Sequence, residues 1–127
     1  MSVDDPVGVL TVDDQEFFLQ AAREVIELTP GFRPAGEASS GREALELLDR
    51  GADAQLALVD VRMPGMNGIE CARLMKEAHP ELAVVLISVS DYPGPEPVVR
   101  KQDFGPALLR GLWQRHCEPS REGRPGD

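Results

Sequence analysis

Several polar side chains of this sequence stand directly after short apolar runs, at the points where strands of a sheet would end. In chain order they are Asp13 and Asp14, Asp60, Ser88 and Lys101. In an open parallel sheet, the carboxyl ends of the strands meet at one edge, and ligands bind just beyond that edge. The sequence therefore predicts that three carboxylates, one hydroxyl and one ammonium group converge on a single pocket.

The chemistry of such a pocket follows from its charges. Two unit charges about 4 Å apart interact by about 4 kcal/mol at an effective dielectric constant of 20, so three clustered carboxylates repel one another strongly. A hard divalent cation relieves this repulsion, and Mg²⁺ prefers oxygen ligands. An ionised carboxylate beside a cation is a competent nucleophile toward a phosphoryl group. The ammonium and hydroxyl groups would then stabilise the phosphoryl oxygens in the transition state.

Taken singly, most of these residues have simpler interpretations. An aspartate between a strand and a helix, such as Asp13 or Asp14, is most often a helix N-cap. Ser88 alone would be a strand-end hydroxyl whose hydrogen bonds are made within the fold. Lys101 alone would be a solvated surface charge. Asp60 differs, because no helix begins directly after it. The presence of a suitable group at four strand ends together favours the joint site.

Apolar runs without polar alternation predict strands that are covered on both faces. The clearest runs are Val7–Val12, Gln55–Asp60 and Leu82–Ser88, and weaker extended segments are Phe32–Ala38 and Pro97–Arg100. Helical spacing of apolar residues lies between them, over 14–28, 40–50, Gly68–Ala78 and Phe104–His116. Ser40 and Glu43 resemble a capping box at the start of the second helix. This alternation predicts an α/β fold, a doubly wound five-stranded parallel sheet in three layers.

The connection before the last strand breaks this pattern. Val89–Glu96 has only eight residues and contains Pro93-Gly94-Pro95. A parallel crossover that contains a helix needs at least about 10 to 12 residues, and this prolyl segment does not form a helix. We expect the fourth crossover helix to be missing or replaced by a loop.

Length and charge restrict the class of protein. The 127 residues fit one domain, which we place at 1–117, and they carry a net charge of −9. This acidity argues against direct binding to nucleic acid or to an acidic membrane. No apolar run is long enough to cross a membrane and no secretory signal begins the chain, so a cytoplasmic location is expected.

Cys71 and Cys117 are expected to be free thiols. The composition of 118–127 predicts a disordered tail or the start of a linker.

Four stretches resemble the receiver domain of two-component response regulators. They are Val12-Asp13-Asp14, the run from Leu58 to Gly68 with its Asp-x-x-Met-Pro-Gly-Met-x-Gly pattern, Val85-Leu86-Ile87-Ser88 and Arg100-Lys101. The resemblance covers about residues 7–116 and implies a flavodoxin-like fold. It also implies a signalling domain rather than an enzyme, although one that assists its own phosphorylation and dephosphorylation. Arg62, where a second acid would stand, argues against the rival Asp-x-Asp phosphatase motif.

The resemblance implies a role for each site residue. Asp60 would accept a phosphoryl group from a sensor histidine kinase or a phosphotransfer protein. Mg²⁺ would be held by Asp13, Asp14, Asp60 and the backbone carbonyl of Arg62. Lys101 would pair with a phosphoryl oxygen and Ser88 would hydrogen-bond another. The output partner stays unknown, and a homodimer is compatible with the resemblance.

Three departures from the family pattern leave a second interpretation open. The fourth crossover helix is expected to be missing or replaced by a loop, Val98 stands where an aromatic residue is usual, and Gln102 stands where a proline is usual. The alternative is a pseudo-receiver, which binds partners constitutively and does not switch on phosphorylation. Cis peptide bonds occur mostly before proline, so Gln102 in place of that proline leaves open whether the Lys101–Gln102 peptide bond is cis.

Overall fold

The computed structural model describes residues 5–90 and 94–117 of the chain. Its strands are β1 (Val7–Val12), β2 (Phe32–Ala38), β3 (Leu56–Asp60), β4 (Ala83–Ser88) and β5 (Val98–Arg100). Its helices are α1 (Glu16–Leu28), α2 (Gly41–Asp49), α3 (Gly68–Ala78) and α4 (Pro106–Cys117), with a 3-10 turn, η1, at Lys101–Asp103. All strand pairs are parallel, in the order β2-β1-β3-β4-β5. The expected five-stranded parallel sheet is confirmed.

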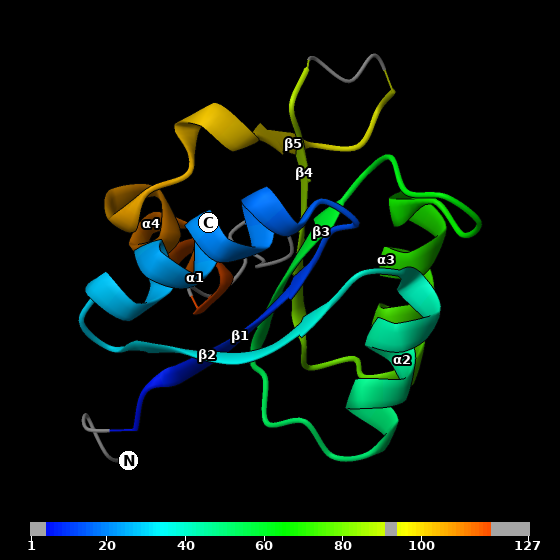
Figure 1. The fold of residues 1–127 in the computed structure, drawn as a ribbon. Coiled ribbons are helices and arrows are strands. Elements are labelled where there is room, and N and C mark those ends of the chain that lie inside the picture. Colours follow the sequence, from blue (N-terminus) through cyan, green and yellow to red (C-terminus); the bar gives the residue numbers. More distant parts are fainter. Residues whose placement is uncertain (1–4, 91–93, 118–127) are drawn as a thin grey trace, which may run out of the picture.

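Helices cover both faces of this sheet, with α1 and α4 on one side and α2 and α3 on the other (Figure 1). Alternate strand residues enter two apolar clusters: Val9 and Leu58 face α1 and α4, whereas Leu10 and Val59 face α2 and α3. All five residues of β3 are buried. Burial on both faces explains why the strand has no polar alternation. In the described part of the chain, no helix is long and apolar enough to cross a membrane.

Local hydrogen bonds explain where two helices begin. Ser40 Oγ accepts a hydrogen bond from the Glu43 backbone N–H at 3.1 Å, as the capping box predicts. The Glu43 carboxylate accepts a hydrogen bond from the Ser39 N–H at 2.7 Å, rather than from the N–H of Ser40. At α3, Asn67 Oδ1 accepts from the Glu70 N–H at 2.9 Å. These side chains satisfy N–H groups that have no partner within the first turn of a helix.

The connection between β4 and β5 contains no helix in its described residues, 89–90 and 94–97. The last helix begins at Pro106 rather than at the expected Phe104, because η1 occupies the residues directly after β5. Within the described ranges every peptide bond is trans, including Lys101–Gln102.

Cys71 is buried and Cys117 is exposed, both as free thiols, and burial raises the pKa of Cys71 to about 11. The expected tail, 118–127, lies outside the described residues.

Gly68 allows α3 to begin directly against the end of β3. Its N–H donates a hydrogen bond to the Val61 carbonyl at 2.8 Å. A Cβ atom at this position would lie 1.9 Å from the Asp60 carbonyl oxygen. Any side chain here would therefore displace the backbone of Asp60.

Gly68→Ala is expected to lower the free energy of unfolding by about 2 to 3 kcal/mol, because the added methyl group overlaps backbone atoms. Gly111→Ala in α4 is the matched control. A Cβ there meets its nearest neighbour, an Arg115 nitrogen, at 3.7 Å. The control should gain about 0.5 to 1 kcal/mol from the helix propensity of alanine. Urea denaturation of both variants measures the effect, and equal stability of Gly68→Ala and wild type would show that the close approach is not needed.

Candidate functional site

The sheet brings the five polar residues selected from the sequence to one edge. Asp13 and Asp14 follow β1, and Asp60 and Ser88 end β3 and β4. Lys101 follows β5 as the first residue of η1. The strand registers place Asp60 beside Ile87 and Ser88 beside Arg100. These side chains therefore emerge from neighbouring strand ends, as expected.

The three carboxylates form a tight cluster. One oxygen from each of Asp13, Asp14 and Asp60 lies within 4.8 Å of the other two. Asp13 is fully buried and Asp60 is 6% exposed, whereas Asp14 lies at the surface. The cluster is thus open to solvent on the side of Asp14.

Asp13 has a different partner for each oxygen. Its Oδ1 accepts a hydrogen bond from the Gln15 N–H at 2.9 Å, just before α1. The N-cap interpretation of Asp13 and Asp14 is wrong, because the N-cap residue of α1 is Gln15, which makes no side-chain cap. Its Oδ2 contacts the Lys101 ammonium in an ion pair, but no described residue donates it a well-oriented hydrogen bond.

Lys101 is held inside the site. Its Nζ lies 3.7 Å from Asp60 Oδ1, and its side chain is only 8% exposed. The solvated-surface interpretation of this lysine is wrong. The Nζ also lies 4.7 Å from the centre of the Phe18 ring, a cation–π contact. Phe18 thus helps to position the ammonium group; the sequence indicated only that it lies on the buried face of a helix.

The environment of Asp60 raises the pKa of its carboxyl group from 3.8 to about 6. Burial is the largest cause, followed by repulsion from the Asp13 carboxylate. The Lys101 ammonium and the Arg62 backbone N–H act in the opposite direction, and the Asp14 carboxylate adds a smaller increase. A group that lowers the local negative charge would therefore favour the ionised, nucleophilic form of Asp60.

The donor set fits a hard divalent cation such as Mg²⁺. Three carboxylates offer oxygen ligands in one cluster, and the Lys101 ammonium beside them offsets only one of their three charges. The solvent-exposed side at Asp14 leaves room for the water ligands that Mg²⁺ usually keeps. Such a cluster is typical of the Mg²⁺ site of receiver domains.

Ser88 lies on the neighbouring strand but makes no hydrogen bond to the carboxylate cluster in the described structure. It is buried, and its Oγ accepts a long hydrogen bond of 3.4 Å from the Ser90 N–H. Two residues before the end of β5, Val98 packs against the apolar cluster under α2 and α3. No aromatic ring occupies this position.

Comparison with known proteins agrees with this geometry. The sequence model of the family described as response regulator receiver domain matches residues 9–95. The nitrate/nitrite response regulator protein NarL of Escherichia coli K12 is 32% identical over 111 residues, which are 87% of this chain and 47% of that protein. A protein-glutamate methylesterase/protein-glutamine glutaminase of Pyrococcus abyssi is 30% identical over 99 residues, 78% of this chain and 26% of that enzyme. The chain thus spans half or less of the length of these relatives.

Solved structures show the same fold. The signal receiver domain of the NarL response regulator from Mycobacterium tuberculosis superposes with a TM-score of 0.75 at 26% identity. The match covers 94% of this chain and 99% of that one. A CheX–CheY complex from Borrelia burgdorferi with BeF₃ and Mg²⁺ gives a TM-score of 0.74 at 22% identity, covering 90% of this chain and 91% of that chain.

Asp60→Asn is expected to stabilise the metal-free protein at pH 7 to 8. The folded-state pKa of about 6 lies above the ordinary value of 3.8, so ionisation of Asp60 opposes folding. This penalty is absent below about pH 4, grows up to about pH 6 and is constant above it. The pKa difference corresponds to at most about 3 kcal/mol, and we expect a gain of about 1 to 3 kcal/mol.

Chemical denaturation with EDTA across this pH range measures the gain. Glu46→Gln, at an exposed carboxylate of α2, is the control and should show no such pH dependence. Added Mg²⁺ should reduce the gain by stabilising the wild type. A gain that is equal at low and neutral pH would contradict the electrostatic explanation.

Proposed function

This chain belongs to the response regulator receiver domain family, and on that premise we propose that it is a phosphorylation-dependent signalling switch. Asp60 accepts a phosphoryl group from a sensor histidine kinase or a phosphotransfer protein in a Mg²⁺-dependent reaction. The observation that carries the proposal is the buried Asp60 carboxylate at the end of β3, with the Lys101 ammonium 3.7 Å away and an oxygen of each of two further carboxylates within 4.8 Å.

The reaction requires an ionised carboxylate. One Asp60 oxygen attacks the phosphorus of a phosphohistidine, the P–N bond breaks, and the imidazole leaves with the bonding electron pair. The product is an acyl phosphate on Asp60. Because burial and Asp13 hold the Asp60 pKa at about 6, a cation beside the carboxylate makes the nucleophile more available at neutral pH.

Mg²⁺ would be held by the carboxylates of Asp13, Asp14 and Asp60 and by the backbone carbonyl of Arg62. When bound, it supplies positive charge for the carboxylates and for the phosphoryl oxygens. Lys101 is already inside the site and can pair with a phosphoryl oxygen without leaving its place over Phe18. Ser88 would hydrogen-bond a further phosphoryl oxygen in place of its long bond from Ser90.

The alternative is a pseudo-receiver that binds its partners constitutively. Two observations favour it: Val98 stands where a switching aromatic ring is usual in the family, and the described part of the β4–β5 connection has no helix. The pocket chemistry is then intact, but phosphorylation would not be transmitted to the rest of the domain. The complete set of charged groups favours the switch.

The remaining assignments follow from the same premise. Residues 1–117 form the receiver domain, which acts in the cytoplasm as a phosphoacceptor rather than as an enzyme of an external substrate. It assists its own phosphorylation and dephosphorylation. Its net charge of −9 opposes direct binding of nucleic acid by this chain.

Incubation with Mg²⁺ and acetyl phosphate is expected to add one phosphoryl group, because the carboxylate is buried beside positive charge. Intact-mass spectrometry measures the addition. Asp60→Asn should abolish it, whereas Asp49→Asn, at an exposed residue of α2, should retain it. Lys101→Gln is expected to slow the reaction by about 100- to 1000-fold, the usual scale for removal of one charge-stabilising donor. An addition that persists in Asp60→Asn would move the acceptor to another residue.

Beryllium fluoride with Mg²⁺ distinguishes the switch from the pseudo-receiver. If the domain switches, amide resonances of β4, β5 and α4 should shift together with those of the pocket, because Ser88 and Lys101 connect the pocket to these elements. Two-dimensional NMR spectra with and without the phosphate mimic provide the measurement, and Asp60→Asn is the control. Shifts confined to residues around Asp60 would support the pseudo-receiver.

A further inference from the structure

One half of β4 lies at an open edge of the sheet. The three residues of β5 pair only with Leu86, Ile87 and Ser88. No described residue forms a strand beside Ala83–Val85 on that side. Val84 and Val85 are correspondingly only half-buried, although Leu82, Ala83 and Leu86 around them are buried.

The backbone of Val84 points to this open edge. Within β4 the Ala83 N–H donates to the Gln55 carbonyl at 3.0 Å, and the Ile87 carbonyl accepts from Val61 at 2.9 Å. Both bonds therefore run toward β3. Since backbone groups of successive strand residues alternate in direction, the N–H and C=O of Val84 face away from β3. Each is a strong hydrogen-bonding group without a strand partner.

Pro97 explains why β5 does not cover this position. Continuing the β4–β5 register by two residues would place Glu96 opposite Val84. The carbonyl of Val84 would then need a hydrogen bond from the N–H of residue 97, as in any parallel ladder. Proline has no N–H, so the ladder ends where β5 begins, at Val98.

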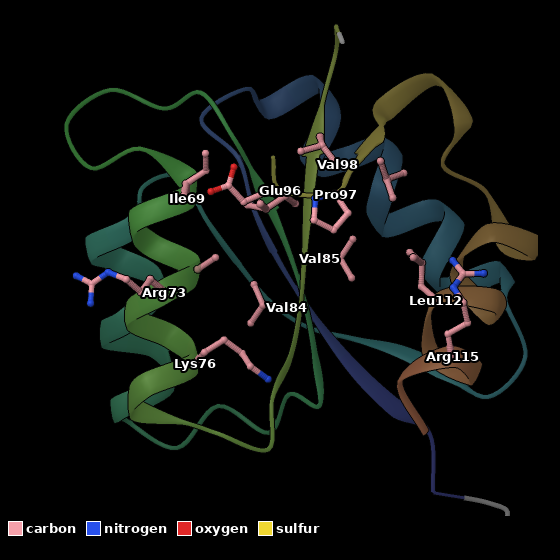
Figure 2. Close-up of a pocket in the computed structure, with 13 residues that line it drawn as sticks. Ile69, Arg73, Lys76, Val84, Val85, Glu96, Pro97, Val98, Leu112 and Arg115 are labelled. Carbon is pink, nitrogen blue, oxygen red and sulfur yellow. The ribbon is translucent and has the colours of Figure 1, made fainter. Parts of the chain in front are cut away.

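A groove of about 640 Å³ runs along this edge. Its walls come from helices on opposite faces of the sheet: Ile69 and Ala72 of α3 on one side, and Leu112 of α4 on the other. Figure 2 shows β4 between the two walls, with the side chain of Val84 directed toward α3 and that of Val85 toward α4. The groove is therefore mainly apolar, and its floor is an unpaired strand edge.

The rim of the groove carries basic side chains. Arg73, Lys76 and Arg115 line it, and Glu96 is the one carboxylate among its lining residues in the described part of the chain. Arg73 is already ion-paired with Glu70 and Glu77 at 2.6 Å, so Lys76 and Arg115 are the cations that bear on an occupant. Lys76 also donates a hydrogen bond to the Leu82 carbonyl at 2.7 Å. This carbonyl is the next one along the edge that faces away from β3, and it therefore already has a partner. In a chain of net charge −9 this basic rim favours an acidic occupant.

We propose that this groove binds an extended, acidic segment of a partner protein, which adds as a strand beside Ala83–Val85. An extended segment satisfies the N–H and C=O of Val84, whereas a helix satisfies its own backbone and would leave both unpaired. Its alternate side chains enter the apolar spaces beside α3 and α4, and its carboxylates meet Lys76 and Arg115. This surface is distinct from the Asp60 pocket, which lies at the carboxyl ends of the strands.

Selection of a random twelve-residue peptide library on the full chain provides the probe. The selected peptides are expected to share alternating apolar residues and carboxylates. Synthetic copies are then N-methylated at one residue at a time. Methylation should weaken binding by about tenfold at the one position whose N–H donates to the Val84 carbonyl, and have little effect at the neighbouring positions, because one backbone hydrogen bond is lost. Val84 amide protection from hydrogen exchange should increase on binding.

Charge-reversal variants of the protein test the rim. Arg115→Glu and Lys76→Glu are each expected to weaken peptide binding by about five- to tenfold, since an attractive pair becomes repulsive. Arg110→Glu, on the same helix as Arg115 but outside the groove lining, is the matched control and should leave binding unchanged. Thermal unfolding verifies that each variant is folded.

Four outcomes would overturn the proposal. They are the absence of any selected peptide, selected peptides that are helical, an N-methyl scan without a sensitive position, and binding that is unaffected by both reversals. A dimer in sedimentation velocity that the peptide dissociates would instead assign the edge to a second copy of this chain.

Discussion

The repulsion among Asp13, Asp14 and Asp60 is the interaction on which the rest of the site depends. Three carboxylates within 4.8 Å of one another are costly in a partly buried setting, and the raised pKa of Asp60 records that cost. Lys101 offsets part of it from the η1 turn after β5, and Phe18 holds Lys101 in place from α1. Two elements far apart in sequence are thus needed to stabilise one charge cluster, whose remaining negative charge favours a cation.

The connection between β4 and β5 links the two surfaces proposed to function. Its shortness and Pro97 limit β5 to three residues, enough to place Lys101 beside Asp60. The same limit leaves the first half of β4 unpaired and opens the groove between α3 and α4. The short connection with Pro97 therefore preserves the charged pocket at the carboxyl end of β4 and exposes the proposed binding edge at its amino end.

Most of the fold could be predicted because its signals are local. The apolar runs gave the strands to within a residue, and Ser40 with Glu43 located the start of α2. The start of α4 was less accurate, because the turn at Lys101–Asp103 has no strong sequence signal. For the site, the aspartates and Lys101 were found as residues at strand ends. The contact of Lys101 with Phe18 was missed, since nothing in an apolar helix face indicates a cation above one of its rings.

By itself the sequence determined the order of strands and helices, the family pattern around Asp60 and the identity of the charged groups, because these depend on residue type and spacing. The tertiary structure decided which of those groups touch. Lys101 faces both Asp13 and Asp60, while Ser88 remains apart from the carboxylates in the described structure. It also decided that Val84 lies at an open edge. Contacts and edges depend on how strands from distant parts of the chain align, and residue spacing does not specify that alignment.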